Sequence, residues 1–434
     1  DPTQFRPAGG PFQSAKDHKE AIYDNTVIGG ITHEFQINNK LKHVLSVFGS
    51  STKLENPFIT NYETRAEKNL GFRTYISYLH GDKENFNLEM QLGAEAQKGW
   101  YHVKNYENNS GVTGDITDDD KLKNGQHFYF YRVRTRLYQK LSAEGSIGLN
   151  FNNINFNRNI AEEDHANGNI DFSDTWMPRF GLSYLATNSL SIRASLSRGY
   201  STPTIAEVRS SDNRINQDLK PETGTNYETG IRFESKNRKL IADFAAYNYQ
   251  MKNGIIRQLN DAGAEYFVNA GKMDQKGIEA NVLAQLISNE NSEILQGLIV
   301  SSNLTYQDYK FKEYEIGEDD FSGNKITSVP NWIWVNTVSL NFNKDIDLNI
   351  LHNFTSSIPL NDANTIEASQ YHILQAKISW IAKLSPSYRL QFFAGADNLL
   401  NEKYSLGNDI NAMGNRYFNA APTRNFYGGI KVIL

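Results

Sequence analysis

The sequence has 434 residues, a net charge of -5 and no cysteine. Without cysteine the chain can form neither a disulfide framework nor a thiolate metal site, and so small a net charge gives no reason to expect a nucleic-acid partner. The mean hydropathy of -0.57 and the lack of any apolar run near 18 residues exclude a membrane-spanning helix, but not spanning strands in which only every second residue faces lipid.

From residue 22 onward the chain alternates between apolar and polar residues, which predicts strand after strand. Residues 1–21, rich in proline and glycine, are expected to be the remainder of an extracellular loop, and the first strand is expected over residues 22–37. The alternation is clearest over residues 277–286, where Ile278, Ala280 and Val282 share one side and Glu279 and Asn281 the other. A helix would instead repeat its apolar residues every three or four positions.

The predicted connections between these strands are alternately short and long. Tight turns are expected near residues 38–39, 81–82, 140–141, 187–188, 236–237, 288–289, 343–344 and 385–386. Long polar loops are expected near residues 53–65, 102–125, 158–173, 200–223, 251–271, 311–325, 357–367 and 403–420. Short turns on the periplasmic side and long loops outside are typical of outer-membrane barrels. The sequence therefore predicts an all-β, transmembrane antiparallel β-barrel.

The number of predicted strands suggests an incomplete barrel. About 17 segments are counted, whereas single-chain bacterial barrels have an even number of strands. An open edge in lipid would leave backbone groups unpaired. We therefore expect residues 1–434 to form a single partial β-barrel domain of a longer protein.

Several short motifs occur in a characteristic order along the second half of the chain. They are SRGYSTP at residues 197–203, LKPE at 219–222, YETG at 227–230, FVNAG at 267–271 with GIE at 277–279, VPN at 329–331, DNLLN at 397–401 with Tyr404, and PTRNFYGGI at 422–430. In order and spacing they resemble the signature of TonB-dependent outer-membrane receptors. The resemblance is strongest from residue 190 onward, and one departure is the terminal Leu434, where the family often ends in Phe.

This resemblance implies a barrel of 22 strands plugged by an N-terminal domain, with the plug and about five strands missing from this chain. Such receptors lie in the outer membrane of Gram-negative bacteria, among lipid and lipopolysaccharide. They import a small-molecule ligand, most often a ferric siderophore or another iron complex, when the TonB complex pulls on the plug. We expect a monomer without a resident cofactor. Cobalamin or an oligosaccharide would use the same scaffold.

Charged residues on the polar side of the strands are the candidate site residues. Arg132, Arg134 and Arg136 recur at every second position, and an arginine facing lipid would cost about 2–4 kcal/mol at the midplane, so they are expected to face the lumen. Pairing with acids of neighbouring strands or of the plug is favoured over direct ligand contact, although a guanidinium also suits an anionic ligand. The same reasoning gives a list of further lumen-facing candidates: Arg193, Glu228 and Glu279.

The predicted loops hold weaker candidates. The acidic residues Asp115 and Asp118 to Asp120 are interpreted as a solvated acidic loop, or one sharing divalent ions with lipopolysaccharide, rather than a calcium site, and the Glu162 to His165 segment as polar surface. No metal site is expected. Arg416, Tyr417 and Phe418 are the ligand-facing candidates, because their loop should lie at the barrel mouth.

Aromatic residues are expected to form girdles at the membrane interfaces rather than to bind ligand. Trp332 and Trp334 share one strand face, and Phe128 and Tyr129 begin another strand.

The sequence gives little support for catalysis, since three common catalytic motifs are absent from it. It has no nucleophile elbow, no His-Glu-x-x-His pair and no phosphate-binding loop. We therefore expect a protein that is not an enzyme. A passive porin or channel and a soluble or adhesive all-β protein are the alternatives to an importer: a porin would lack a plug, and a soluble protein would bury its apolar face.

Overall fold

The computed structural model describes residues 17–58, 61–82, 84–160, 167–260, 264–385 and 388–433. Seventeen strands form one sheet in which each strand is antiparallel to the next. They are β1 (Tyr23–Asn38), β2 (Leu41–Pro57), β3 (Tyr62–Gly81), β4 (Phe86–Asn108), β5 (Thr113–Leu137), β6 (Leu141–Arg158), β7 (Asn167–Thr187), β8 (Leu190–Ser201), β9 (Glu222–Glu234), β10 (Leu240–Lys252), β13 (Lys272–Ser288), β14 (Leu295–Glu313), β17 (Trp332–Phe342), β18 (Ile346–Thr355), β21 (Tyr371–Lys383), β22 (Arg389–Asp397) and β25 (Asn425–Ile433). The predicted count of about 17 strands is confirmed.

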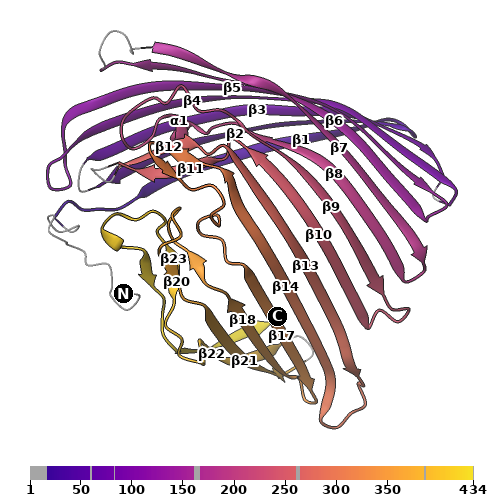
Figure 1. Ribbon diagram of the computed structural model, residues 1–434. Helices are drawn as coiled ribbons and strands as arrows, with labels where there is room; N and C mark the ends of the chain where they lie inside the picture. Colours follow the sequence, from indigo (N-terminus) through magenta and orange to yellow (C-terminus); the bar gives the residue numbers. More distant parts are fainter. Residues whose placement is uncertain are drawn as a thin grey trace.

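Short elements occupy the long connections at one end of the sheet. They are α1 (Ile205–Val208), β11 (Ile255–Leu259), β12 (Glu265–Asn269), β15 (Glu315–Ile316), β16 (Asp319–Asp320), β19 (Ile358–Pro359), β20 (Glu367–Ala368), β23 (Ser405–Asn408), η2 (Met413–Asn415) and β24 (Phe418–Ala420). Figure 1 shows the sheet bending round from β1 to β22, with α1, β11, β12, β20 and β23 within the bend. Within the described residues, no helix is long and apolar enough to cross a membrane.

The register of the strands gives the sheet one apolar and one polar face. Leu92, Tyr131 and Ile147 are directly opposite one another across β4, β5 and β6, and all three side chains are exposed. The neighbouring row on the other face begins with Gln91 and Arg132. Because successive side chains of a strand point to opposite faces, this difference continues along the sheet. An exposed apolar face is the arrangement of a barrel whose outside meets lipid.

The tight turns and the long connections lie at opposite ends of the strands, as predicted. At the short end, β17 and β18 are joined by a turn in which Lys344 and Asp345 have φ angles of 65° and 58°. Two consecutive residues with positive φ are typical of the turn that best matches the twist of a hairpin. The turn predicted at residues 385–386 lies partly outside the described residues, and so does the segment 162–165.

Two predicted loops are mainly strand, so these predictions were wrong. Strands β2 and β3 run through most of residues 53–65, and β4 and β5 run through most of 102–125. At this end the apolar residues change faces: Val103, Leu122 and Ile154 are buried on the polar face, where the β8–β9 connection packs against them. The apolar alternation that marks a strand in lipid is therefore interrupted, although the backbone stays extended.

The sheet is not closed within the described residues. Strand β1 pairs with β2 and β25 pairs with β22, and no register joins β1 to β25. Every residue of β1 is exposed. Each outermost strand therefore presents one edge of unpaired backbone groups.

Candidate functional site on the polar face

The three arginines predicted to share a face do so on β5. Arg132, Arg134 and Arg136 alternate with Tyr131 and Val133, which lie on the apolar face. Arg134 is opposite Glu89 of β4 and Glu144 of β6, so acids of both neighbouring strands are within reach. The strand period and the antiparallel register together assemble this row of charges.

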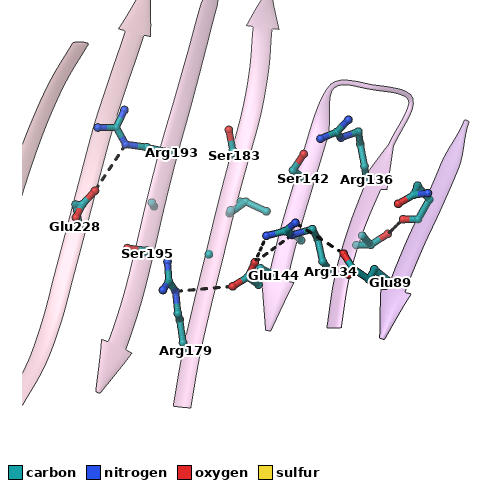
Figure 2. A pocket seen from close by; sticks show the side chains of 16 residues that line it. Glu89, Arg134, Arg136, Ser142, Glu144, Arg179, Ser183, Arg193, Ser195 and Glu228 are labelled. Carbon is teal, nitrogen blue, oxygen red and sulfur yellow. Dashed lines mark hydrogen bonds and ion pairs between the residues drawn. The ribbon is translucent and has the colours of Figure 1, made fainter. Parts of the chain in front are cut away.

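Glu144 is the centre of an ion-pair network. Its Oε2 atom lies 2.7 Å from Arg132 Nη2 and 3.1 Å from Arg134 Nη2, and its Oε1 atom lies 4.0 Å from Arg179 Nε. Arg134 also lies 3.8 Å from Glu89. Figure 2 shows the arginines of two strands converging on this carboxylate. Cross-strand pairing, which we favoured for the arginines, is what the geometry provides for Arg132 and Arg134.

A second network lies farther along the same face. Arg193 of β8 forks onto Asp243 of β10, with Nη2 2.8 Å from Oδ1, and its Nε lies 3.7 Å from Glu228 of β9. Arg232 also reaches Asp243, at 3.7 Å. Planar guanidinium groups suit such shared carboxylates because they donate in a fork. Arg193 and Glu228, two of the lumen-facing candidates, thus lie within ion-pair distance of each other, and Asp243 is a further partner of Arg193 that the sequence did not reveal.

Between the two networks lies a cavity of about 560 Å³. Its charged lining consists of Glu89, Arg134, Arg136, Glu144, Arg179, Arg193 and Glu228. Arg136 has no ion pair among the described residues, and Figure 2 shows it apart from the network around Glu144. The cavity therefore presents one guanidinium without an ion pair beside carboxylates that are already paired with arginines. Such a lining can contact either a charged protein surface or an anion.

Glu279 is not part of this cavity. It is exposed on the polar face of β13, opposite Ala245 of β10 and Thr305 of β14. The structure thus brings five of the six lumen-facing candidates to one region, with Arg132 beside the cavity and the other four lining it. Glu279 lies two strands beyond Glu228 in the sheet, because β10 separates β9 from β13.

At the long-loop end, the connection between β8 and β9 folds onto the polar face. It contains α1, which begins with a capping box: Thr204 accepts from the Glu207 backbone N–H, and the Glu207 side chain accepts from the Thr204 N–H. Val208 and Leu219 pack against Phe156 and Phe172 of the strands below. Burial of these side chains holds the connection against the sheet.

A buried ion-pair cluster fixes the same connection. Asp120 of β5 is fully buried and accepts from Arg158 Nε at 2.9 Å and from Arg209 Nε at 2.9 Å. Arg158 also binds Asp118 at 3.2 Å, and Arg209 lies 3.5 Å from Glu63. The interpretation of these aspartates as a solvated loop was therefore wrong: Asp118 and Asp120 lie in a strand and are neutralised by arginines. Within the described residues no cluster of metal-ligating side chains is found.

Asp119 points to the other face of β5. Burial tends to raise its pKa, but hydrogen bonds from His102, at 2.6 Å, and from Asn159, together with the charges of His102 and Lys104, outweigh burial and lower the pKa. This carboxylate is therefore held ionised.

A buried carboxylate also joins the loops at the far side of the mouth. Asp362 is 3% exposed and accepts from Tyr314 Oη at 2.9 Å, from Gln258 Nε2 at 3.0 Å and from Asn411 Nδ2 at 3.1 Å, and in addition from Thr327. Burial and the neighbouring Asp362 raise the pKa of Tyr314. Four connections, those around residues 258, 314–327, 362 and 411, are thus held by one side chain.

The ligand-facing candidates at the mouth divide. Tyr417 is 6% exposed and packs with Leu360 and Ala368, so our expectation of exposure was wrong for this residue. Phe418 packs against the same cluster, whereas Arg416 is exposed.

The aromatic residues expected to form girdles also divide. Trp332 and Trp334 are exposed on the apolar face. Phe128 lies on the polar face, stacked on Phe130, whereas its neighbour Tyr129 points to the apolar face. The expected girdle thus includes Tyr129 and excludes Phe128.

Comparisons with known proteins agree on one kind of barrel. Residues 2–399 match the sequence profile of the family described as "TonB dependent receptor-like, beta-barrel". An uncharacterized TonB-dependent receptor of Haemophilus influenzae is 28% identical over 152 residues, which is 29% of this chain and 43% of that protein.

Solved structures show the same fold at lower identity. The ferric citrate transporter FecA, in its unliganded form, superposes with a TM-score of 0.78 at 16% identity, over 95% of this chain and 62% of FecA. The siderophore receptor PiuA from Acinetobacter baumannii superposes with a TM-score of 0.74 at 13% identity, over 96% of this chain and 65% of PiuA. The chain thus spans less than two thirds of the length of each of these proteins.

Proposed function

Because the chain belongs to the family of TonB-dependent receptor β-barrels, we propose that it forms the wall of an outer-membrane importer for a ferric siderophore or another iron complex. The family consists of transport receptors rather than enzymes. The iron-complex assignment is supported by the similarity to FecA, a ferric citrate transporter, and to PiuA, a siderophore receptor. In this proposal the ligand is cargo, and the protein has no resident cofactor.

The polar face is the observation that carries the proposal. This face has paired charges around a cavity of about 560 Å³, and Arg136, which lines the cavity, has no ion pair among the described residues. Such a wall suits contact with another folded, charged surface. We therefore propose that a plug domain outside residues 1–434 packs against it and transmits the pull of the TonB complex.

Further strands outside this chain would complete the barrel. Strands β1 and β25 each present an unpaired edge in the described residues, and each unpaired backbone group in lipid costs several kcal/mol. Strands inserted between β1 and β25 would remove both edges. The complete importer is then a monomer in the outer membrane, in contact with lipid and lipopolysaccharide.

Uptake of radioactive iron by cells that lack or carry the intact receptor tests this function. Ferric citrate, a ferric hydroxamate and a ferric catecholate would be supplied to cells with and without functional TonB. The proposal predicts saturable uptake of at least one complex that requires both the receptor and TonB. Uptake that persists without TonB would indicate the alternative, a passive channel, and TonB-dependent uptake of cobalamin or an oligosaccharide alone would replace iron as the cargo.

Charge reversal on the polar face links the uptake to this wall. Arg136→Glu is expected to reduce the uptake rate, because it places a negative charge in the cavity. Lys140→Glu makes the same charge change in the exposed turn between β5 and β6 and is expected to leave uptake unchanged. Equal uptake rates for the two variants would show that Arg136 does not contribute to uptake.

A further inference from the structure

Two histidines meet on the apolar face of strands β18 and β21, which are neighbours in the sheet. The register places Phe354 of β18 opposite both Trp334 of β17 and His372 of β21. His352 is two residues before Phe354, so both imidazoles lie on the face that carries the exposed Trp334. His352 Nε2 and His372 Nδ1 are 3.0 Å apart. The two rings therefore form a pair that is diagonal across the two strands.

The histidine pair lies where the apolar band of these strands ends. Nearer the short turns, every side chain of this face is apolar: Ile346, Leu348 and Ile350 on β18, and Leu374, Ala376, Ile378 and Trp380 on β21. His372 follows Tyr371, with which β21 begins, and is exposed. Amphipathic rings at such a boundary lie at the level of the lipid headgroups. Water and dissolved ions can reach the pair at this level.

Neighbouring rings hold both imidazoles in place. The two imidazoles stack on each other with ring centroids 5.3 Å apart and an angle of 22° between their planes. Trp334 meets the ring of His352 edge-on at 6.4 Å, and Phe354 lies against the ring of His372 at 4.7 Å. Because these contacts restrict the rings beforehand, the pair loses less conformational entropy when it binds a ligand.

Asn336 of β17 is placed to set the tautomer of His352. Its Nδ2 atom lies 3.3 Å from His352 Nδ1. A side-chain amide has a donor end and an acceptor end, so with its oxygen turned to the ring it accepts from Nδ1–H. The proton on Nδ1 then leaves a lone pair on Nε2, the atom that faces His372. Imidazoles that bind a metal almost always donate their other N–H in this way.

We propose that His352 and His372 bind a copper(II) ion at the outer rim of the barrel. The ligands are His352 Nε2 and His372 Nδ1. Two nitrogens about 2.0–2.1 Å from one ion and 3.0 Å apart subtend roughly 95° at the ion. That angle is closer to the right angle of a tetragonal ion than to the tetrahedral geometry that zinc prefers, and tetragonal sites with nitrogen and oxygen ligands are typical of copper(II).

The remaining positions of the ion would be filled by water. No third histidine, cysteine or carboxylate joins the pair among the described residues. Without the metal, one ring donates its N–H to the other, whereas with copper both facing nitrogens carry lone pairs. The location at the outer rim rests on the proposed orientation of the barrel in the outer membrane, but copper binding itself does not.

Copper binding would be measured on the intact receptor, purified in mild detergent and stripped of metal with EDTA. It would be titrated with copper sulfate at pH 7.5, and electron spin echo modulation would count the imidazoles on the ion. The unmodified receptor is expected to hold copper with two imidazoles. His352→Gln and His372→Gln should each raise the dissociation constant at least tenfold and abolish the two-imidazole spectrum. Unchanged affinity in either variant would overturn the proposal and leave a hydrogen bond only.

Two other histidines of the apolar face provide a matched control. The register places His33 of β1 and His80 of β3 on this face, and both are exposed. Among the described residues their ring contacts are with phenylalanine and tyrosine, not with a second imidazole. His33→Gln and His80→Gln should therefore change the dissociation constant of copper less than twofold. A loss of affinity equal to that of His352→Gln would overturn the proposal.

Variants of Asn336 test its role as a positioning residue. Asn336→Leu should weaken copper binding roughly tenfold and keep two imidazoles in the spectrum, because it removes only the oxygen that accepts from His352. Asn336→Asp keeps an acceptor and should bind copper at least as tightly as the unmodified receptor. Equal weakening in both variants would contradict this role. Iron uptake, measured on the same variants, is expected to be unchanged, so copper binding and the transport function can each fail alone.

Discussion

Removing the Arg209 guanidinium should release the connection between β8 and β9. Arg209 and Asp120 are 1% and 0% exposed in their side chains, and their Nε–Oδ2 distance is 2.9 Å. Removing one partner of a buried ion pair typically costs about 3–5 kcal/mol, because the other charge stays buried. Asp120 keeps Arg158 at 2.9 Å, so we expect the lower end, about 3 kcal/mol, for Arg209→Ala. Since about 1.4 kcal/mol is a factor of ten, the connection should open roughly 150 times more often.

Amide hydrogen exchange measures this opening directly. The Val208 N–H donates to Thr204 and the Asn216 N–H donates to Val208, so both amides are protected only while the connection is folded. Exchange at these amides should accelerate roughly 150-fold in Arg209→Ala if exchange follows local opening. Arg214→Ala, which removes an exposed arginine of the same connection, should leave the rates unchanged. Equal rates in Arg209→Ala and the unmodified protein would refute the reasoning.

Three further outcomes follow from the other carboxylates. Glu144→Gln removes the shared partner of Arg132 and Arg134 and should lower the free energy of unfolding by about 2–3 kcal/mol, seen as a lower midpoint in heat-modifiability gels; an unchanged midpoint would contradict the pairing. Asp362→Asn should speed proteolysis of the surrounding loops, whereas Asp319→Asn, at an exposed position, should not. The pKa of Asp119 is lowered below its usual 3.8, so its contribution to stability is present above pH 3.8 and is lost as the pH falls through the lowered pKa. Asp119→Asn should remove this pH-dependent part of the acid-unfolding curve. An acid-unfolding curve identical to that of the unmodified protein would contradict the stabilising role of Asp119.

The sequence predicted the membrane-spanning part of the fold well, and the physical reason is the period of two. In lipid every second side chain must be apolar, so the alternation within a single strand such as β13 is enough to predict that strand. The same signal failed for the outer halves of β4 and β5, where the buried apolar residues Val103 and Leu122 lie on the polar face. Residues 118–120 then look like an acidic loop although they are extended.

The candidate site was predicted where it depends on one strand and missed where it depends on distant segments. The spacing of Arg132, Arg134 and Arg136 was enough to place them on one face. The pairing of Arg209 with Asp120 joins residues 89 positions apart, and nothing in either local sequence announces the partner. The burial of Tyr417 likewise depends on Leu360, which belongs to another connection.

We expect the apolar face of this sheet to meet lipid and the polar face to meet the lumen. Because the chain has no cysteine, single cysteines at adjacent positions can carry a spin label without further changes to it. Leu182 lies on the apolar face of β7 and is 50% exposed, and Ser183 lines the cavity on the polar face. In reconstituted intact receptor, the label at Leu182→Cys should collide with oxygen and not with a water-soluble nickel chelate, and the label at Ser183→Cys should not collide preferentially with oxygen. A label at Leu182→Cys that the nickel chelate reaches freely, or a preference for oxygen at Ser183→Cys, would contradict the account.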